Sequence, residues 1–389
     1  MKISGKLSED NRVTILALSW RDIKAPTAGG AEVHTHEMLK RLNHNKYRVI
    51  HFAPLYKGEE REEAIDGVQY IRKGNIISVI WYAFLYYKKN RKKIKYVIDQ
   101  CNTHRFFTPL WVEHKKRIFY IHQLTREIWD INLKFPFSKI GKALESVFLR
   151  LNRKDYAITV SESTRQELVD LGFDRNKIII VHNGISFEPW FEEQMYEKEE
   201  IPTFIYVGRY AYYKGIDAAV MAIGKLHQQH INACLWILGK KNEEYVEKKL
   251  KPICEKYNLK WGDGEKGCDK DIISWGFVSE EKKLELLSRA TALLFPSIRE
   301  GWGIPITEAG VVGTPSIVYN SPGIRDAVDG GKAGYLCQSN SVEELMEMMR
   351  LSIDDAALYQ EKKQWAYDFS KEFRWDKTGK VLEQFLDNK

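Results

Sequence analysis

Short runs of aliphatic and β-branched residues recur along the chain, and the longer stretches between them carry apolar residues at helical spacing. This alternation is typical of parallel strands joined by crossover helices, and it predicts an α/β fold in both halves of the chain. The predicted strands of the first half are Arg12–Leu18, Tyr47–Ala53, Val68–Ile71, Tyr96–Asp99, Arg117–Ile121, Tyr156–Val160 and Ile178–Val181. Those of the second half are Thr203–Val207, Cys234–Leu238, Ile272–Trp275, Ala292–Phe295, Ser316–Val318 and Ala333–Leu336.

One stretch between the two halves fits neither periodicity. Residues 186–202 contain two prolines and a cluster of acids, which indicates a linker. Together with the length of 389 residues, this predicts an N-terminal domain over 1–190, a linker over 191–202 and a C-terminal domain over 203–365. The last segment, 366–389, is predicted to form a helix that packs back on the N-terminal domain.

The net charge of +7 is unevenly distributed. Residues 1–190 hold 33 basic and 21 acidic side chains, whereas residues 191–389 hold 27 and 32. An aromatic content of 12% excludes global disorder. Five scattered cysteines, none in a C-x-x-C pair, argue against a disulfide scaffold or a zinc module and favour a reducing compartment. The polar segment Met1–Asp10 lacks the pattern of a signal peptide, so we expect a cytoplasmic location.

The longest apolar run, Ile76–Tyr87, is followed directly by the basic sequence KKNRKKIK. The run is shorter than the roughly 20 residues that cross a bilayer. One interpretation is a helix that lies on an anionic, cytoplasmic membrane surface. Its candidate docking residues are Trp81, Tyr82, Lys88, Lys89, Arg91, Lys92 and Lys93. The other interpretation is a core helix with a solvated, charged end.

Candidate chemistry lies where predicted strands run into helices, because ligands bind beyond the carboxyl ends of strands in parallel sheets. After the first strand, Gly29 and Gly30 open a helix whose N-terminus favours an anion. After the strand Thr203–Val207, Arg209 and Lys214 place two positive charges where they can converge on a diphosphate. Taken singly, these features are also compatible with a tight turn and with two solvated surface bases.

The most specific pattern is Glu300 followed eight positions later by Glu308, with glycines at 301 and 303 beside the first carboxylate. Glu300 is predicted in a loop and Glu308 on the following helix. A carboxylate in such a loop can accept hydrogen bonds from sugar hydroxyls, and one near a helix start can accept from ribose. An acid that merely complements the helix dipole would explain Glu308 poorly.

These motifs, in this order, resemble those of the family 4 retaining glycosyltransferases over nearly the whole chain. The resemblance also includes Gly313-Thr314-Pro315, Gly323 to Asp326 and His182 to Ile185. It implies the GT-B fold, in which two Rossmann-like parallel-sheet domains face each other across a cleft. The basic N-terminal domain would serve the acceptor, and the C-terminal domain would bind the nucleotide-sugar donor.

The resemblance implies roles for matching residues. The candidate catalytic residues are His122, Arg209, Lys214 and Glu300, with His122 near the sugar and the two bases neutralising the diphosphate. The candidate donor-binding residues are Gly29, Gly30, Phe277, Val278, Gly301, Trp302, Gly303, Ile304 and Glu308, with contacts through the backbone at 277–278 and 301–304. The sequence departs from the family pattern at Gly239-Lys240-Lys241, and residues 261–271 are expected to be an inserted, inert surface loop.

The expected reaction transfers a sugar, with retention, from a UDP-sugar or GDP-mannose to a glycan or lipid-linked acceptor in polysaccharide or glycoconjugate biosynthesis. No cofactor and no metal are expected, because fixed cations around the diphosphate stabilise the leaving group. An epimerase or a phosphorolytic enzyme of the same architecture is the alternative. A nucleic-acid-binding module would use the basic half as its footprint, but no binding motif supports it, so no nucleic-acid partner is expected.

Overall fold

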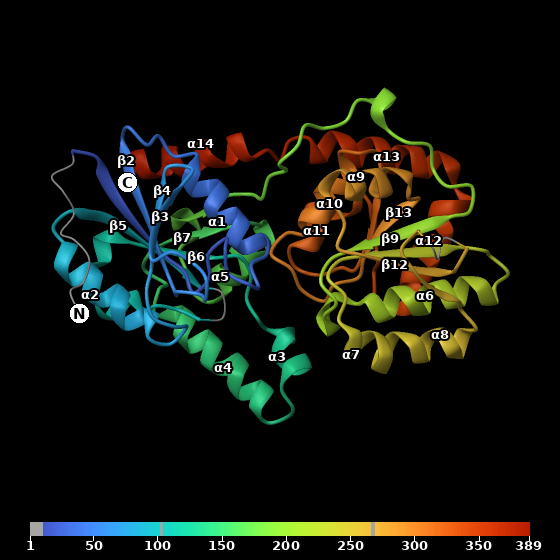
Figure 1. Cartoon of the computed structure of the whole chain (residues 1–389), viewed down its shortest axis with the longest axis horizontal. Coiled ribbons are helices and arrows are strands. Elements are labelled where there is room, and N and C mark those ends of the chain that lie inside the picture. The colour runs from blue at the N-terminus through green and yellow to red at the C-terminus, as the bar shows by residue number, and fades with distance from the viewer. Residues whose placement is uncertain (1–10, 102–103, 266–268) are drawn as a thin grey trace. The chain divides into compact units, whose positions relative to one another are not determined.

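The computed structural model describes residues 11–101, 104–265 and 269–389 (Figure 1). The polar segment 1–10, Cys268 and its two preceding residues in the expected loop 261–271 lie outside the described residues. The chain forms two compact units. Unit 1 comprises the described residues up to Thr125 together with Ile140–Gly184 and Arg374–Lys389, and unit 2 comprises Arg126–Lys139 and Ile185–Phe373.

Unit 1 is built on a sheet with the strand order β3-β4-β2-β1-β5-β6-β7-β8, in which all neighbours are parallel except β3 and β4. Its strands are β1 (Val13–Leu18), β2 (Tyr47–Ala53), β3 (Glu62–Ile65), β4 (Val68–Arg72), β5 (Ile94–Cys101), β6 (Arg117–Ile121), β7 (Tyr156–Thr159) and β8 (Ile178–Ile180). Its helices include α1 (Gly30–Lys40), α2 (Val79–Asn90), α5 (Glu162–Asp170) and α14 (Trp375–Asn388). Helix α4 (Phe137–Arg150) begins in unit 2 and continues in unit 1 from Ile140. The charged edge strand β3 was not predicted, since its sequence EEAI lacks an apolar run.

Unit 2 is built on a parallel sheet with the order β11-β12-β10-β9-β13-β14-β15. Its strands are β9 (Thr203–Val207), β10 (Cys234–Leu238), β11 (Trp261–Asp263), β12 (Ile272–Gly276), β13 (Ala292–Phe295), β14 (Ser316–Val318) and β15 (Tyr335–Leu336). Its helices include α3 (Glu127–Asn132), α6 (Ile216–Gln228), α7 (Glu243–Tyr245), α8 (Lys251–Tyr257), α9 (Glu280–Arg289), α10 (Ile304–Gly310), α11 (Ile324–Ala327), α12 (Val342–Asp354) and α13 (Ala356–Ser370).

The expected surface loop 261–271 is wrong at its start. Residues 261–263 form the edge strand β11, and Trp261 pairs with Ile272 of β12. The sequence WGD is too short and too polar to be recognised as a strand without its partner. This segment therefore extends the sheet of unit 2.

The expected linker is attached to unit 2 rather than suspended between two domains. The backbone N–H of Trp190 donates to the carbonyl of Val311 at 3.0 Å. The ammonium of Lys198 donates to the carbonyl of Ser288 at 2.8 Å and to Oγ1 of Thr314 at 2.7 Å. Burial lowers the pKa of Lys198 to about 7. The boundary expected at 190 lies instead at Gly184, and residues 191–202 form a strap along unit 2.

A second difference concerns residues 126–139, which the sequence places inside the N-terminal domain but the structure places in unit 2. Glu127 of α3 accepts a hydrogen bond from Nε of Arg299 at 2.5 Å. The Arg299 side chain is only 2% exposed, whereas the Glu127 side chain is 52% exposed, so a buried guanidinium meets a carboxylate at the surface. A contact between residues so far apart in sequence leaves no local pattern from which it could be predicted.

The C-terminal segment expected as one helix over 366–389 is two helices that belong to different units. Helix α13 ends at Ser370 in unit 2, and α14 begins at Trp375 in unit 1. Leu382 and Leu386 of α14 are buried in the core that also contains residues of α1 and β1. The last helix, α14 in Figure 1, therefore contributes side chains to the hydrophobic core of unit 1.

Helix α2 carries the apolar run for which an interfacial position was one interpretation. Val79, Ala83 and Tyr86 are buried in a core cluster with Leu16 and Phe52. Trp81 is exposed, and Tyr82 packs partly against the same cluster. The bases Lys88, Lys89, Arg91, Lys92 and Lys93 are exposed. The helix is thus a core helix with a charged end. Among the described residues, no helix is long and apolar enough to span a bilayer.

Candidate active site

The donor-side candidates of unit 2 lie at the carboxyl ends of neighbouring strands. Residues 208–214 follow β9, and residues 296–303 follow β13, which pairs with β9. Residues 277–278 follow β12, two places away from β9 in the sheet. Because all these strands are parallel, the segments emerge at one edge, where ligands bind in open α/β sheets.

The turns after β9 and β13 are locked together by a close backbone approach. Gly215 has a φ of +73°, and a Cβ on it would lie 2.2 Å from the carbonyl oxygen of Pro296. The N–H of Ile298 donates to the carbonyl of Tyr213 at 2.9 Å. Only glycine tolerates both the positive φ and this contact. The residue that precedes it, Lys214, is therefore held against the loop that carries Glu300.

Lys214 and Glu300 form a direct ion pair, in which Nζ of Lys214 donates to Oε1 of Glu300. Their side chains are 13% and 14% exposed, so the pair is largely removed from water but still reaches solvent. Nζ of Lys214 also lies 5.7 Å from the ring centroid of Phe295. Arg209 is not part of this pair, since its guanidinium is exposed and donates to the hydroxyl of Tyr213 at 3.3 Å. Both predicted cations thus lie in the segment after β9. Lys214 is paired with Glu300, and Arg209 is exposed at the surface.

The backbone after Glu300 is held by packing on both sides. The indole of Trp302 is 3% exposed and donates to Oγ1 of Thr307 at 2.9 Å. It contacts the ring of Phe373, with ring centroids 4.7 Å apart and the planes tilted by 56°. A Cβ on Gly323 would lie 2.4 Å from the carbonyl oxygen of Glu300. The Trp302 side chain is therefore a structural anchor, which leaves only backbone groups of residues 301–304 for a ligand.

Glu308 lies on α10, as expected, and its carboxylate accepts from Nζ of Lys283 at 2.9 Å. Burial raises the pKa of Glu308 despite this lysine. For Lys283, burial lowers the pKa, but Glu308 and Glu280 outweigh it and the net pKa is raised. The sequence did not predict Lys283 as a partner, because α9 and α10 meet only in the folded unit.

The loop after β12 exposes an aromatic ring at the same edge. Gly276 has a φ of +69°, and its carbonyl accepts from the N–H of Gly239 at 2.8 Å. The next residue, Phe277, is 90% exposed, whereas Val278 is half-buried. A turn that is fixed on the sheet and presents an exposed ring can stack on a planar base. The sequence singled out only the backbone of this loop.

In unit 1 the Gly-Gly turn differs from expectation. Gly29 is the N-cap of α1, and its N–H donates to Oε2 of Glu32 at 2.7 Å. Oε1 of Glu32 accepts from Nε of Arg21 at 2.9 Å. The N–H of Gly29 at the N-terminus of α1 is thus already bonded to the carboxylate of Glu32, which lies in the first turn of the same helix. Gly30, the first residue of α1, is exposed.

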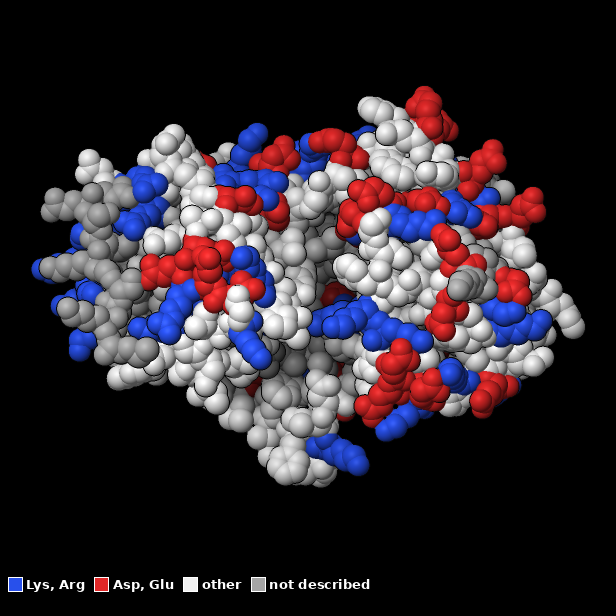
Figure 2. All heavy atoms as spheres, viewed as in Figure 1, with Lys and Arg blue, Asp and Glu red and all other residues white. Residues whose placement is uncertain are grey.

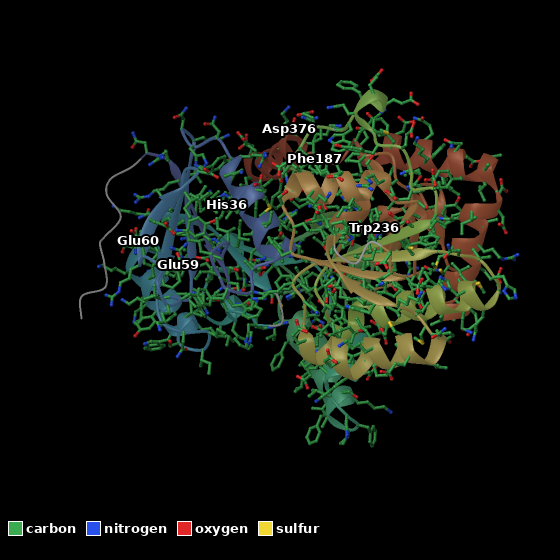
Figure 3. All side chains as sticks on the ribbon, turned by 45° about the vertical axis from the view of Figure 1, so that its right-hand side comes forward. His36, Glu59, Glu60, Phe187, Trp236 and Asp376 are labelled. Atoms are coloured by element: carbon green, nitrogen blue, oxygen red, sulfur yellow. The ribbon has the colours of Figure 1, made fainter. Side chains whose placement is uncertain are left out.

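His122 follows β6 and ends a chain of hydrogen bonds through unit 1. Nε2 of His34 lies 2.8 Å from the carbonyl oxygen of Val181. Nδ1 of His34 contacts the hydroxyl of Tyr120, which lies 2.9 Å from Nε2 of His122. His36, two positions further along α1, is labelled in Figure 3. Its Nδ1 contacts the hydroxyl of Tyr70 at 2.7 Å instead.

The carbonyl at Val181 fixes the direction of this chain, because it can only accept. Nε2 of His34 must therefore carry the proton, so Nδ1 of His34 accepts from the hydroxyl of Tyr120. The hydroxyl oxygen of Tyr120 then accepts from Nε2 of His122. This leaves Nδ1 of His122 with a free lone pair.

The pKa values agree with neutral rings. Burial lowers the pKa of His34 to about 4. Burial and the neighbouring His34 hold the pKa of His122 well below its usual value. Nδ1 of His122 is buried and has no hydrogen-bond partner within the described part of the chain. His122 can therefore accept a hydrogen bond from a hydroxyl, and the chain through Tyr120 and His34 is the feature that sequence reasoning missed.

Two family models match the chain. Residues 190–369 match glycosyl transferases group 1, and residues 28–188 match glycosyltransferase family 4. A glycogen synthase of Mycobacterium tuberculosis is 28% identical over 244 residues, which span 62% of this chain and 56% of that protein. An uncharacterised glycosyltransferase of Methanocaldococcus jannaschii, MJ1178, is 24% identical over 96% of this chain and 99% of its own length.

Solved structures match the whole fold. Sucrose-phosphate synthase from Thermosynechococcus elongatus superposes with a TM-score of 0.74 at 16% identity, covering 97% of this chain and 99% of that chain. Anabaena HepE in complex with UDP-glucose gives 0.71 at 13% identity, covering 97% and 100%. The likeness confirms the predicted GT-B fold, with its two Rossmann-like parallel-sheet domains. The chain belongs to the glycosyltransferases of group 1, family 4.

Proposed function

We propose that this glycosyltransferase moves a sugar, with retention, from a nucleotide-diphosphate sugar to a hydroxyl of a glycan or lipid-linked acceptor. UDP-sugars and GDP-mannose are the first candidate donors, and polysaccharide or glycoconjugate biosynthesis is the expected context. The solved complex of HepE with UDP-glucose supports a nucleotide sugar as donor. The observation that carries the proposal is the Lys214–Glu300 pair at the strand ends of unit 2.

The Lys214–Glu300 pair fits a nucleotide-sugar donor because the ammonium and the carboxylate would contact different parts of it. Breaking the bond between the sugar and the diphosphate builds negative charge on the leaving group, which a fixed ammonium stabilises. In the proposed complex Lys214 and Arg209 contact the diphosphate, and Glu300 accepts hydrogen bonds from sugar hydroxyls. Since Glu300 already holds Lys214 in place, little reorganisation is required when the donor binds.

The proposed step is attack on the face from which the diphosphate leaves. The acceptor oxygen forms a bond to the anomeric carbon while the bond from that carbon to the diphosphate oxygen breaks. The electron pair stays on the diphosphate, whose oxygen takes the proton of the acceptor hydroxyl. Glu300 is a binding residue in this scheme, so a covalent glycosyl-enzyme on Glu300 would contradict it.

The remaining candidates hold the donor at its two ends. Glu308 accepts from ribose hydroxyls, and the exposed ring of Phe277 and the backbone of Val278 contact the base. The backbone at Gly301, Gly303 and Ile304 contacts the sugar. In unit 1, Nδ1 of His122 accepts from a sugar hydroxyl, and Gly30 faces the diphosphate. Gly29 serves as the helix cap, because its N–H is used by Glu32.

We propose that no metal or other cofactor is required, because Lys214 and Arg209 supply the positive charge that a divalent ion would otherwise bring. Activity should then survive excess chelator. A loss of activity with chelator that added magnesium or manganese restores would contradict this.

The first experiment is a thermal-shift screen of nucleotide sugars, because a ligand that binds the native state raises the unfolding midpoint. The hit is then assayed for release of nucleoside diphosphate with and without acceptor, and NMR of the anomeric proton reports retention. Acceptor-dependent transfer is the expected result. Conversion of the donor to another sugar nucleotide without release would indicate an epimerase, and phosphate-dependent release would indicate a phosphorolytic enzyme.

A further inference from the structure

Gln100, near the end of β5, is a buried residue whose side-chain amide has no partner. The residue is 2% exposed. Neither Oε1 nor Nε2 of its amide makes a hydrogen bond within the described part of the chain. Buried polar groups without a partner are rare in native proteins, so each one requires an explanation. None of the contacts proposed above uses this amide.

The strand register places Gln100 beside Tyr120. The two residues are paired between β5 and β6, and paired residues of parallel strands point to the same face of the sheet. Ile98, two residues before Gln100, lies in one core cluster with Tyr120, which agrees with this face. The ring of His122 lies close by, with its centroid 4.8 Å from that of Tyr120. Gln100 therefore lies next to the hydrogen-bond chain that ends at His122.

The neighbouring polar groups already have partners. Both ring nitrogens of His34 and the hydroxyl of Tyr120 are used in the chain that ends at His122. The hydroxyl of Thr35, which follows His34 on α1, donates to a backbone carbonyl of its own helix at 2.8 Å. Among the described residues, the amide of Gln100 and Nδ1 of His122 stay unpartnered and buried.

Together, these two groups complement a hydroxyl. A hydroxyl has one hydrogen to donate and lone pairs that accept. Nδ1 of His122 can accept that hydrogen, and Nε2 of Gln100 can donate to the oxygen. Oε1 of Gln100 is then free to accept from a second hydroxyl beside the first. Adjacent hydroxyls are what a sugar ring offers, and the carboxyl ends of parallel strands are where ligands bind.

The surroundings of Gln100 are suited to a neutral group. Figure 2 shows Lys, Arg, Asp and Glu side chains spread over the surface of both units. By contrast, His34 and Tyr120 beside Gln100 are buried, and the chain that they form with His122 is neutral. His122 itself is partly exposed at the end of β6, so a sugar can reach this position.

We propose that Gln100 is a specificity-determining residue for the donor sugar, whose amide donates to the same hydroxyl that donates to Nδ1 of His122 and accepts from the next hydroxyl. The inference rests on the proposed function and adds the group that recognises the correct sugar. A sugar that lacks this hydroxyl would leave two buried protein groups unpaired, and sites of this kind reject such analogues strongly.

The first test compares stability with donor binding in Gln100→Met. Methionine has a similar length and leaves no buried amide unpaired, so the unfolding midpoint of the ligand-free protein should stay the same or rise. Calorimetry with UDP-glucose and GDP-mannose should show roughly 10-fold weaker binding of the donor. Gln166→Met makes the same substitution at an exposed residue of α5 and should bind like the wild type. A lower midpoint with unchanged binding would mean that the amide holds a buried water only, and would overturn the proposal.

The second test uses monodeoxy derivatives of the donor, each lacking one sugar hydroxyl. For the wild type, one derivative should lose roughly 10²-fold in kcat/KM relative to the parent donor. In Gln100→Met the same derivative should lose ~10-fold or less, because the amide that recognises the hydroxyl is absent. Equal losses in the two proteins would overturn the proposal.

The third test distinguishes the donor sugar from the acceptor. The side-chain amide of Gln100 is identified in ¹⁵N NMR by its absence from Gln100→Met. Its signal should shift when the donor is added without acceptor, and should not shift with nucleoside diphosphate alone. A shift that requires the acceptor would overturn the assignment to the donor. Donor binding without any of these changes contradicts this inference alone, whereas a failure of every nucleotide sugar to bind contradicts the proposed function as well.

Discussion

The two units present different chemistry at the ends of their strands. Unit 2 presents ions, since Lys214 is paired with Glu300 and Lys283 with Glu308. Unit 1 presents neutral groups at the end of β6, where burial keeps His34 and His122 uncharged. The difference follows from the surroundings. The side chains of both ion pairs in unit 2 keep 13–16% exposure, one pair on the turns after β9 and β13 and the other between α9 and α10. The imidazoles of unit 1 lie in a buried chain of hydrogen bonds. A charged site can stabilise a leaving group, and a neutral one can orient hydroxyls without altering the charge balance.

The largest effect is expected from removing the paired cation of unit 2. Lys214→Met should lower kcat/KM for nucleotide-sugar turnover by roughly 10²- to 10³-fold, because the charge that stabilises the diphosphate is lost. Steady-state kinetics measure this. Lys240→Met, an exposed lysine in the loop after β10, is the matched control and should be near wild type. Equal effects of the two substitutions would contradict a specific role for Lys214.

In unit 1, Tyr120→Phe removes the hydroxyl that joins His34 to His122 while it keeps the buried ring. We expect kcat to fall roughly 10-fold with little change in the KM for donor. Without the Tyr120 hydroxyl, the imidazole of His122 loses the hydrogen bond that orients its Nδ1 lone pair toward the sugar. The ring nitrogens of His122 should also shift in ¹⁵N NMR as the Nε2-protonated tautomer loses its partner. A fall in kcat without any change in the imidazole spectrum would point to a merely structural role for Tyr120.

The neutral chain also makes a prediction about stability and pH. His34 has a pKa of about 4 in the folded state, below its unfolded value near 6.5, so the unfolded state binds more protons between these values. Stability should therefore fall as the pH drops from about 6.5 to 4, by up to ~1.4 kcal/mol per pH unit from this residue. Denaturant unfolding should show a shallower pH slope in His34→Asn. An unchanged slope would mean that His34 does not titrate in this way.

The smallest effect is expected at the donor's ribose. Glu308→Gln keeps an oxygen that can accept a hydrogen bond but loses the charge that pairs with Lys283. The KM for donor should rise roughly 5-fold with kcat almost unchanged, as for the loss of one modest hydrogen bond to a bound substrate. Nucleotide binding by calorimetry gives the same information without turnover. A loss of kcat as large as that of Lys214→Met would instead place Glu308 at the reacting centre.

The sequence predicted the parts of the fold that depend on local pattern. The apolar strands were found because burial on both faces produces continuous runs, as in β1 and β9. The positions of Glu300 and Glu308 relative to α10 followed from the glycines between them. The edge strands β3 and β11 were not predicted. Each is short and polar, so it can be recognised as a strand only from its hydrogen bonds to the neighbouring strand.

Other features depend on contacts that no local pattern contains. The partner of Glu308 comes from α9, and the chain that fixes His122 joins β6 to α1 and to the end of β8. For the apolar run of α2, the sequence left open whether the run lies in the core or on a surface. Only the folded unit decides, because it buries Val79, Ala83 and Tyr86.

The contact between Glu127 and Arg299 has a practical consequence for isolating unit 2 as a fragment. A fragment cut at 185–373 would omit residues 126–139 and remove the carboxylate that meets an otherwise buried guanidinium, one position from Glu300. Such a fragment would remove one charged partner of Arg299 beside the loop that is expected to hold the sugar. A fragment that keeps all of unit 2 has to be assembled from residues 126–139 and 185–373, joined by a short connector.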